Sequence, residues 1–582
     1  MSQVNKDTEN VAVPADNVDV VEAPVTWRTY AMCIFASFGG IFFGYDSGYI
    51  GGVQGMQYFI HMIDGPDAVS LQSWESSLIV SILSAGTFFG ALIAGDLADW
   101  FGRRTTIIAG CIVFIIGVIL QTASAGLGLL VAGRDLADWF GRRLTIILGC
   151  GVFIVGVILQ TASAGLGLLV AGRLIAGFGV GFVSAIIVLY MSEIAPKAFR
   201  GAIVSGYQFC VTIGLMLAAC VTYATETFTD SSSYRIPIAL QMLWALILGV
   251  GLFFLPESPR FFVKKGKIDE ARVALGRVRG QPSDSEYINA ELSEIVANAE
   301  YERRVIPNTG YFGSWAACFS GSLFKANSNV RKVILGTSIQ MMQQWTGVNF
   351  VFYYSTPFLQ STGAISNVFL ISLIFTLVNV CSTPISFWLV ERFGRRSMLI
   401  WGAIGMTICE FLVGIIGVTI GFDKTYVNAA GASVPVNISA VNAQIAFIAI
   451  YIFCFATTWG PAAWVVIGEI FPLPIRSRGV ALSTASNWLW NCIIAVITPY
   501  LVGADKANLQ SKIFFMWGSL CLCCLVYSYF LVPETKGLTL EQVDRMMDEV
   551  SPRKSASWKP TTTYAGELHR MDAEKLDKEE AI

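Results

Sequence analysis

The chain has 582 residues, of which 54% are apolar and 14% are charged, whereas a soluble protein carries about 25% charged residues. Several apolar runs reach about 20 residues, the length at which a helix crosses a bilayer, so the composition excludes a soluble globular enzyme. A net charge of −2 without a basic stripe excludes a nucleic-acid partner.

The histidines and cysteines exclude further kinds of chemistry. The chain has 2 histidines, His61 and His569, and most of its 13 cysteines stand inside apolar runs without a spacing that suggests a metal site. We therefore expect no metal and no cofactor, and a protein that is not an enzyme.

Thirteen apolar runs are candidate membrane-spanning helices. A polar, acidic segment precedes them and lacks the basic start and short apolar core of a secretory signal peptide. The polar tail after the last run is predicted to be disordered. The runs are 27–50, 74–95, 105–125, 144–164, 167–190, 201–222, 236–255, 331–360, 364–390, 397–421, 442–467, 477–502 and 511–532.

A charged stretch separates seven of these runs from the other six and divides the chain into parts. We expect short helices within this stretch, because acids and bases recur there at helical spacing. The predicted parts are an N-terminal tail (1–26), an N-terminal bundle (27–255), a linker (256–330), a C-terminal bundle (331–532) and a C-terminal tail (533–582).

Lysine and arginine are concentrated in alternate loops, which predicts the orientation of the chain. The loop 51–73 has no lysine or arginine, and the loop 422–441 has only Lys424. The other set of alternate loops and the linker are rich in lysine and arginine. By the positive-inside rule, both termini and the linker are cytosolic, and the membrane is expected to be the plasma membrane. The sequon that begins at Asn437 then lies outside and is a candidate glycosylation site.

The two halves of the chain repeat the same motifs in the same order. Glu193-Ile-Ala-Pro is echoed by Glu469-Ile-Phe-Pro, and Pro256-Glu-Ser by Pro533-Glu-Thr. The segment Asp99-Trp-Phe-Gly-Arg-Arg is likewise echoed near residue 391. Such ordered matches predict two parallel copies of one unit, as in transporters built from two related bundles.

A second repeat is local. Residues 96–134 and 135–173 are a tandem copy of 39 residues that differ at four positions. If both copies spanned the membrane, all later loops would change sides, so we predict that twelve helices form the fold and that one copy does not span in register. The first copy has the natural upstream neighbour and the second the natural downstream neighbour. A local duplication and an error in the gene model are both open explanations.

Five motifs together resemble the sugar porter family of the major facilitator superfamily, and fungal hexose transporters above all. The resemblance covers about residues 27–540 and implies an all-α membrane protein of twelve helices in two six-helix bundles, with a central sugar site and alternating access. The duplication departs from the family pattern at the third helix. The motifs are Asp96–Arg104, Gly177-(x)3-Gly181-(x)11-Glu193-(x)6-Arg200, Pro256–Arg260, Gln343–Asn349 and Pro533–Gly537.

Acids and bases gather at the predicted cytosolic helix ends. They either determine topology, with little energy in each exposed pair, or form an ion-pair lock between the bundles, which the resemblance favours. The members of this lock are Asp99, Arg103, Arg104, Glu193, Arg200, Glu257, Arg260, Glu391, Arg395, Arg396, Glu469 and Arg476.

Asp46 is an ionisable residue inside an apolar run, which makes it a functional candidate. Arg173 lies at the same predicted depth, roughly 8–9 Å below the outer surface at 1.5 Å per residue. An opposite charge keeps an aspartate ionised, and the resemblance implies that this pair is the proton site of a symporter. A static structural pair is the alternative, and so is transport without protons.

Gln343, Gln344 and Asn349 place three amides in one apolar run, where they need a wet cavity or a polar ligand. On a straight helix Gln343 and Asn349 would lie 240° apart, so we predict a break near Gly347. Amides both donate and accept, as sugar hydroxyls do. Helix–helix contact through amides is the alternative.

The resemblance adds further residues to the sugar site and its gate. We interpret Tyr353 and Tyr354 as aromatic residues of an outer gate, and Gly460-Pro461 predicts a kink. The added site residues are Gln208, Asn379, Trp464, Asn487 and Trp488.

The sequence thus predicts a monomeric hexose transporter in a lipid bilayer, with a monosaccharide and a proton as its partners. Facilitated diffusion and transport of a polyol or disaccharide remain open. A glucose receptor is the alternative of another class, although only 49 residues (534–582) follow Pro533.

Overall fold

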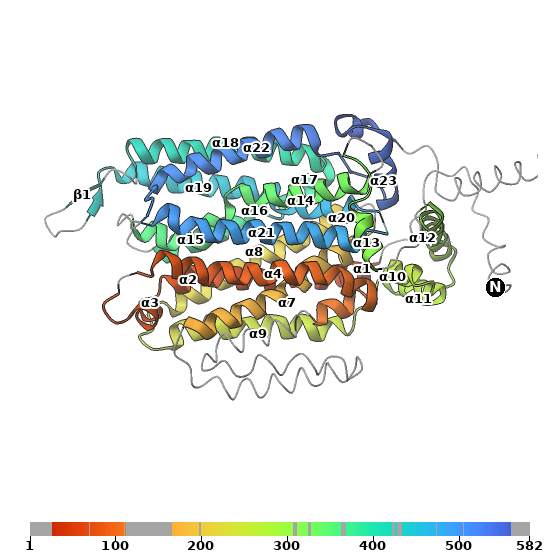
Figure 1. The fold of residues 1–582 in the computed structure, drawn as a ribbon, viewed down its shortest axis with the longest axis horizontal. Coiled ribbons are helices and arrows are strands. Elements are labelled where there is room, and N and C mark those ends of the chain that lie inside the picture. The colour runs from red at the N-terminus through yellow and green to blue at the C-terminus, as the bar shows by residue number, and fades with distance from the viewer. Residues whose placement is uncertain are drawn as a thin grey trace, which may run out of the picture.

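The computed structural model describes residues 26–109 except 69, then 111, 166–196, 199–305, 311–323, 328–361, 368–421, 425–427, 433–472, 474–503 and 506–559. Run 144–164, most of run 105–125, segment 1–25 and segment 560–582 lie outside this part of the chain. Long helices run side by side along the long axis of the molecule (Figure 1).

The first half builds one set of these long helices, followed by short helices of the linker. Gln72 and Glu75 form a capping box at the start of α4, which fixes where that span begins. The elements are α1 (Trp27–Ser37), α2 (Gly39–Gln54), α3 (Gln57–Asp64), α4 (Ser73–Phe101), α7 (Leu166–Ile194), α8 (Arg200–Thr225), α9 (Ser232–Leu252), α10 (Pro259–Lys264), α11 (Ile268–Arg279), α12 (Glu286–Val305) and α13 (Tyr311–Cys318).

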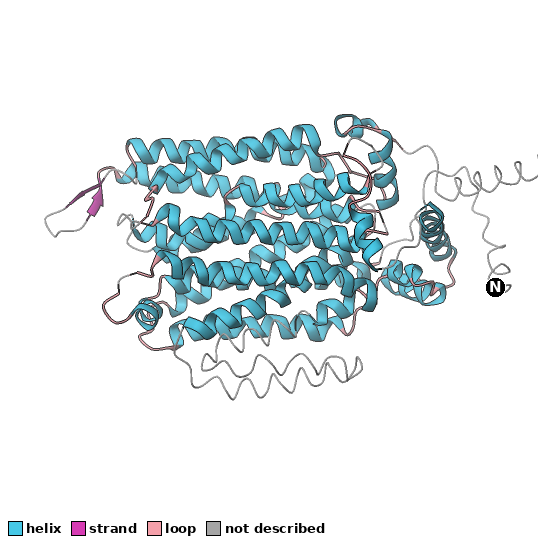
Figure 2. Ribbon diagram, viewed as in Figure 1, coloured by secondary structure: helices cyan, strands magenta, loops and turns pink. Residues whose placement is uncertain are grey.

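The second half builds the other set of long helices and one small hairpin, in which β1 and β2 pair antiparallel (Figure 2). The elements are α14 (Asn329–Trp345), α15 (Val348–Ser361), α16 (Val368–Ser382), α17 (Ile385–Arg392), α18 (Arg395–Thr419), β1 (Thr425–Val427), β2 (Ser433–Pro435), α19 (Ile438–Thr457), α20 (Trp459–Glu469), α21 (Arg476–Val502), η3 (Gln510–Lys512), α22 (Ile513–Leu531), α23 (Leu540–Glu549) and η4 (Pro552–Ser557).

Among the described residues, 8 helices or joined helices are long and apolar enough to cross a membrane, and α16 with α17, bent by 42°, makes a ninth. The shorter pieces α1 with α2 and α14 with α15 complete two more spans. Together with the helical segment described at residues 103–109, they fit the predicted twelve-helix, all-α membrane fold.

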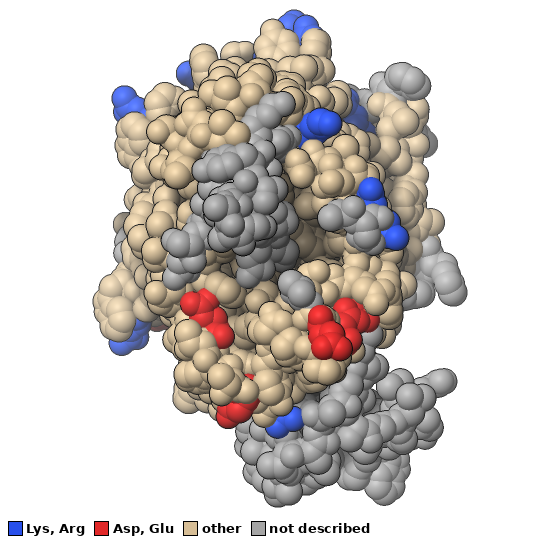
Figure 3. Space-filling view, turned by 90° about the vertical axis from the view of Figure 1, so that its left-hand side faces the viewer, with Lys and Arg blue, Asp and Glu red and all other residues tan. Residues whose placement is uncertain are grey.

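The bundle has two distinct ends. The linker helices and α23 lie at one, the linker end, and the β1–β2 hairpin lies at the other, the hairpin end (Figure 1). Seen from the hairpin end, few charged side chains interrupt the surface (Figure 3). The hairpin was not predicted from the sequence, where this segment is simply a polar loop.

The two halves meet along a seam of packed helices. The seam is formed by α4 and α7 against α21, by α2 against α15, and by α8 against α16, α17 and α20. Gly51 of α2 lies so close to Tyr353 of α15 that an added Cβ would be 2.9 Å from the Tyr353 carbonyl oxygen. The hairpin half of the seam is therefore closed, as is the linker half described below.

The first copy of the tandem repeat begins the third span. Residues 103–109 are helical, and Ile107, Ile108 and Cys111 are buried. A Cβ added to Gly249 of α9 would lie 3.7 Å from the Cys111 side chain. Arg173 of the second copy lies in α7. The start of the first copy and the end of the second are thus the described parts of the repeat, and the junction between the copies lies outside the described residues.

The predicted disorder of the tail is wrong for residues 533–559. Thr539 and Gln542 form a capping box that starts α23, and Val543, Met546 and Met547 of this helix are buried against the bundle. The amphipathic spacing of these apolar residues was the signal that the polar composition concealed.

Candidate substrate-binding site

A small cavity of about 60 Å³ lies at the centre of the molecule between the two halves. It has room for a few water molecules, so the protein is closed around it on both sides. Its lining residues are Phe43, Ser47, Gln208, Val211, Leu215, Gln343, Gln344, Val348, Asn349, Phe352, Tyr353, Asn379, Phe455, Trp464, Asn487 and Asn491.

A helix break brings the three clustered amides together, as predicted. α14 ends at Trp345 and α15 begins at Val348, with Gly347 between them at φ +81°, a value that glycine adopts without steric cost. The Asn349 side chain donates a hydrogen bond to Gln344 Oε1 across the break. Gln343, Gln344 and Asn349 therefore face one cavity although they come from two helix segments.

Further amides extend this polar wall. Asn487 Nδ2 of α21 donates to Gln343 Oε1 at 2.8 Å, and Gln343 Nε2 donates to the Gly460 carbonyl oxygen at 2.8 Å. Asn491 Nδ2 donates to the Tyr353 hydroxyl at 3.2 Å. These bonds fix the orientations of the amide side chains. The amide lone pairs and N–H groups that they leave unused are therefore held in place before a ligand enters the cavity.

The opposite wall combines amides with aromatic rings. Gln208 of α8 is the amide that the first half supplies. Both side-chain polar atoms of Asn379, in α16, are buried without a hydrogen-bond partner among the described residues. Trp464 of α20 packs edge-on against Tyr207 with ring centres 5.3 Å apart. An unsatisfied buried amide is costly, so Asn379 is suited to a polar ligand.

Trp488 is the one predicted sugar-binding residue outside the cavity lining. Its Nε1 donates to Ser184 Oγ of α7 at 3.2 Å, and its ring lies 4.9 Å from that of Phe43. It therefore joins α21 to the first half behind the cavity wall. Asn491, which sequence reasoning missed, faces the cavity from the next helical turn after Asn487.

The predicted gate residues lie on the hairpin side of the cavity. The Tyr354 hydroxyl donates to the Ala495 carbonyl oxygen at 2.8 Å. Tyr353 lines the cavity and accepts from Asn491. Both tyrosines thus bond to α21 while their backbone lies against α2.

The helix pair α19 and α20 breaks close to the predicted kink. The break falls at Thr458, two residues before Gly460-Pro461, and Gln343 Nε2 donates to the carbonyl oxygens of Trp459 and Gly460 in the first turn of α20. The start of α20 is thereby bonded to the amide wall of the cavity.

Asp46 and Arg173 are both fully buried on α2 and α7, but they do not form a direct ion pair. Arg173 Nη1 donates to the Tyr49 hydroxyl at 2.5 Å, and its guanidinium carbon lies 5.6 Å from the centre of that ring. Neither carboxylate oxygen of Asp46 has a hydrogen-bond partner within the described part of the chain. Tyr49, one turn after Asp46, was not singled out from the sequence.

At the linker end, the first half builds a buried charged cluster. Arg103 binds the Glu193 carboxylate through Nε at 3.1 Å and Nη2 at 3.0 Å, and the Ser258 hydroxyl donates to the same carboxylate. Glu257 Oε1 accepts from the Arg103 backbone N–H at 3.0 Å, and Glu257 Oε2 from that of Arg104 at 3.2 Å. Burial raises the pKa of the Glu257 carboxyl.

The second half builds the same cluster with equivalent residues. Arg395 binds Glu469 through Nε at 3.2 Å and Nη2 at 2.8 Å, and the Thr535 hydroxyl donates to Glu469 at 2.6 Å. Glu534 accepts from the backbone N–H groups of Arg395 at 2.9 Å and Arg396 at 3.2 Å. The sequence repeat is thus also a repeat of hydrogen bonds.

These clusters are mainly internal to each half, and other contacts cross the seam. Arg478 of α21 binds Asp96 at 3.0 Å and Asp99 at 3.5 Å, and the Ser477 hydroxyl donates to Asp99 at 2.5 Å. Glu391 accepts from the Ala202 backbone N–H at 3.0 Å. Arg103 Nη2 also donates to the Ser477 hydroxyl at 3.4 Å. Asp99, Glu391 and Arg103 of the predicted lock therefore contact the other half through partners that sequence reasoning missed.

The linker covers this closed seam. Lys264 Nζ of α10 lies 2.8 Å from Asp99, and burial lowers the pKa of its ammonium group. Trp315 Nε1 of α13 donates to Asp96 at 3.0 Å, and the Arg478 guanidinium lies over the Trp315 ring. These contacts hold the short helices α10 and α13 of the linker against the seam.

The remaining predicted lock residues bond near the same end. Arg200 Nη1 donates to the Leu538 carbonyl oxygen at 3.4 Å, and Arg476 Nε donates to that of Phe471 at 2.9 Å. Arg396 Nη2 donates to the Tyr529 carbonyl oxygen at 2.7 Å, and Arg260 is buried.

Two repeated bundles around a closed, amide-lined cavity define a membrane transporter of the major facilitator type. The chain belongs to the family described as "Sugar (and other) transporter", whose model matches residues 32–137 and 135–547. The first match ends and the second begins at the start of the second copy of the tandem repeat.

The curated relatives include transporters and a sensor. The major facilitator-type transporter ecdD of Aspergillus rugulosus is 41% identical over 94% of this chain and 93% of its own length. The probable glucose transporter rco-3 of Neurospora crassa is 37% identical over 93% and 83%. The high glucose sensor RGT2 of Saccharomyces cerevisiae is 38% identical over 88% of this chain and 60% of its own length.

Solved structures share the fold. The proton:xylose symporter XylE of E. coli bound to 6-bromo-6-deoxy-D-glucose has a TM-score of 0.69 and 24% identity, over 89% of this chain and 99% of that chain. The inward-open structure of XylE has a TM-score of 0.59.

Proposed function

We propose that this protein carries a hexose such as glucose across the membrane by alternating access. The observation that carries the proposal is the amide wall of the central cavity, which offers donors and acceptors side by side, as the hydroxyls of a sugar require. Trp464 adds an aromatic face on which the C–H face of a pyranose can stack. Membership in the sugar transporter family agrees with this chemistry.

The closed seams give the transport cycle its two gates. Opening the linker end breaks the contacts of Asp96, Asp99 and Glu391 across the seam, and opening the hairpin end separates Tyr353 from α2. Each half rocks about the cavity, so that one set of contacts forms as the other breaks. No covalent step is involved.

Exchange of radiolabelled glucose by the purified protein in liposomes tests this function. We expect Asn349→Ala to weaken glucose affinity by about 10-fold to 100-fold, the loss for one or two hydrogen bonds in a buried site. Gln444→Ala is the matched control, because Gln444 is a buried amide of α19 that bonds to Val413 and does not line the cavity. Absence of exchange for every hexose, polyol and disaccharide tried would disprove the proposal.

We further propose that transport is coupled to protons through Asp46. A buried carboxyl without a hydrogen-bond partner and a buried arginine held by Tyr49 can form an ion pair once the proton leaves Asp46, and this change of partner would couple protonation to movement of α2 against α7. The ion pair is thus expected in another state of the cycle.

Accumulation of glucose against its gradient, with and without an uncoupler, tests the coupling. Asp46→Asn should abolish accumulation and keep exchange, whereas Tyr49→Phe should keep the charges and shift the pH dependence of uptake. Accumulation that persists in Asp46→Asn refutes coupling at this residue. Exchange without accumulation in the unaltered protein indicates facilitated diffusion.

We propose that the linker end is cytosolic. The scarcity of charge on the hairpin end (Figure 3) and the buried basic residues of the linker end support this orientation. Asn437 is exposed beside the hairpin and caps α19 through its Oδ1, which accepts from the Ala440 backbone N–H. A mass shift on treatment with an N-glycosidase, lost in Asn437→Gln, would confirm that this end is outside.

A glucose sensor is the second candidate, because RGT2 is as similar as the transporters are. A sensor binds sugar in the same cavity and does not complete the cycle. Glucose binding by the detergent-solubilised protein, combined with no exchange in liposomes, would favour this function.

A further inference from the structure

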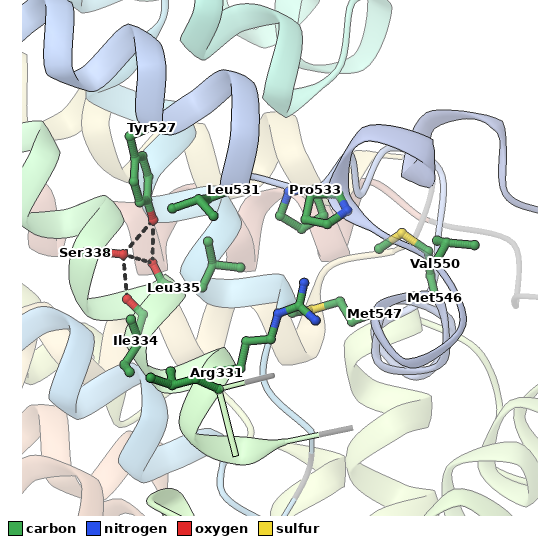
Figure 4. Close-up of a pocket in the computed structure, with 12 residues that line it drawn as sticks. Arg331, Ile334, Leu335, Ser338, Tyr527, Leu531, Pro533, Met546, Met547 and Val550 are labelled. Carbon is green, nitrogen blue, oxygen red and sulfur yellow. Dashed lines mark hydrogen bonds between the residues drawn. The ribbon is translucent and has the colours of Figure 1, made fainter. Parts of the chain in front are cut away.

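A second cavity of about 260 Å³ lies at the linker end, away from the seam between the two halves. It is larger than the central cavity and close to the lower end of the range for small-molecule sites. Helices α14, α22 and α23 enclose it (Figure 4). The proposed transport cycle makes no use of this cavity.

The cavity walls are almost entirely aliphatic. Leu335, Met546 and Val550 are typical of the lining, and the hydroxyls of Ser338 and Tyr527 contribute the polar floor. These hydroxyls lie 2.6 Å apart, and each also bonds to backbone carbonyl oxygens of α14 (Figure 4). Because their hydrogens are directed at backbone carbonyl oxygens and at one another, and the other walls are aliphatic, the interior suits a hydrocarbon chain better than a sugar.

The position of the cavity gives access from the side. α22 ends at Leu531 and α14 begins at Asn329, so the cavity lies where two spans leave the hydrocarbon core and reach the headgroup level. The lining residues Leu323, Ile334 and Leu531 are 53%, 44% and 55% exposed. An acyl chain can enter between these residues without opening the bundle.

One positive charge stands at the mouth. The Arg331 guanidinium reaches toward Met547 across the cavity (Figure 4), and Arg331 forms no ion pair with any described residue. Its neighbour Lys332 takes the carboxylates of Asp544 and Asp548 instead. Arg331 is therefore left to pair with an anion from outside the chain.

We propose that this cavity binds an anionic phospholipid, with one acyl chain between α14, α22 and α23 and the phosphate on Arg331. The lipid would join α14, which carries Gln343 and Gln344 of the central cavity, to the C-terminal helix α23. If the linker end is cytosolic, the cavity faces the leaflet that is rich in anionic lipid. Lipid binding does not depend on the proposed function, since the cavity would fill in a protein that moves no sugar.

Photolabelling in nanodiscs tests the site. The full chain is placed in phosphatidylcholine discs that contain a trace of phosphatidylserine or phosphatidylcholine with a diazirine in one acyl chain, and labelled peptides are identified by mass spectrometry. We expect phosphatidylserine to label the segment 546–550 about fivefold more than phosphatidylcholine, which is the effect of one basic residue near the membrane surface.

Two variants and a control define the contacts. Arg331→Gln should reduce labelling by phosphatidylserine to the level of phosphatidylcholine, and Val550→Trp should block both lipids by filling the cavity. Arg392→Gln, an exposed arginine at the same end, should change neither. The size-exclusion profile of each variant shows whether it is folded, and Arg331→Gln alone carries the test if Val550→Trp aggregates.

Three results would overturn the proposal. They are no labelling of segment 546–550 in the unaltered protein, equal labelling by the two lipids, and full competition by soluble glycerophosphoserine, which would show that the acyl chain is not needed. Loss of glucose exchange with labelling intact would refute the transport function and leave the lipid site standing.

Discussion

The two halves of this protein are alike at the linker end and different at the centre. The same ion pair occurs in both halves, between Arg103 and Glu193 in the first and between Arg395 and Glu469 in the second. In each half a hydroxyl also donates to the carboxylate. The central cavity has no such symmetry, because the second half supplies nearly all of its amides.

This difference separates scaffold from function. Both copies of a duplicated unit need a rigid turn where two spans meet at the membrane surface, and the charged cluster of each half provides it. We call each of these two clusters a corner. The centre is free to diverge, so the second half carries most of the cavity amides and the first half carries the Asp46, Tyr49 and Arg173 group. The predictions below test whether the corners are truly equivalent.

The largest expected effect is the loss of a buried carboxylate from either corner. Glu193→Ala and Glu469→Ala should each cost about 3–5 kcal/mol, because each leaves a buried arginine without its partner. Thermal unfolding in detergent, followed by tryptophan fluorescence, should show similar falls in the midpoint. Glu300→Ala, at an exposed linker residue, should leave it unchanged. If one of the two substitutions left the unfolding midpoint unchanged, the clusters of the two halves would not be equivalent.

The glycine before each arginine should show the next largest effect. Gly102 has φ +100° and Gly394 has φ +85°, and an added Cβ would collide with the Glu257 or Glu534 carboxylate. Alanine at either position should cost about 1–3 kcal/mol in the same unfolding assay.

Gly266→Ala provides the control for backbone strain alone. Gly266 has φ +75°, and no atom lies within 4 Å of an added Cβ. The loss of stability in Gly266→Ala therefore measures backbone strain without a steric clash. If Gly102→Ala and Gly394→Ala cost no more than this control, the carboxylates contribute nothing to the requirement for glycine.

The contacts that cross the seam should differ between the halves. Asp99 meets the cations of Arg478 and Lys264, whereas Glu391 crosses the seam to a neutral backbone N–H. Asp99→Asn should therefore favour opening of the linker end by about 1.5–3 kcal/mol, and Glu391→Gln by about 0.5–1.5 kcal/mol. Distances between spin labels on α4 and α21 report the open population, and equal shifts would contradict this order.

Sequence patterns predicted the parts of the structure that depend on local spacing. The break at Gly347 followed from the angle between Gln343 and Asn349, and the matching corners followed from the ordered motif pairs. Helical periodicity could also have found Asn491, which lies four residues after Asn487.

Features that depend on tertiary packing were not predictable in the same way. Glu193 and Arg103 are 90 residues apart, partly because of the duplication, and no local pattern selects their pairing. Arg173 was matched to Asp46 only because both lie at the same predicted depth. Depth does not show that the Tyr49 hydroxyl, at a similar depth, accepts a hydrogen bond from Arg173 instead. The tail helix α23 was concealed because its polar face dominates its composition, although Val543, Met546 and Met547 on its apolar face are buried.

The smallest effect is expected where each half meets its neighbouring short helix. In the first half, Lys264 of α10 supplies a cation to Asp99, whereas in the second half Asp544 and Asp548 of α23 supply anions to Lys332. Burial raises the pKa of Asp548 to about 6, with Lys332 opposing the shift and Asp544 adding to it. α23 should therefore respond to pH between 5 and 7.5.

The sign follows from the raised pKa. A buried carboxyl with a raised pKa destabilises the docked helix when it is ionised above pH 6, and protonation below that value relieves the cost. Hydrogen exchange in α23, corrected for intrinsic rates, should thus be slower at pH 5 than at pH 7.5. Asp548→Asn should remove this dependence while exchange in α10 stays constant. Faster exchange of α23 at pH 5 would mean that the Lys332 ion pair outweighs burial, and the two halves would then hold their short helices by the same electrostatic means.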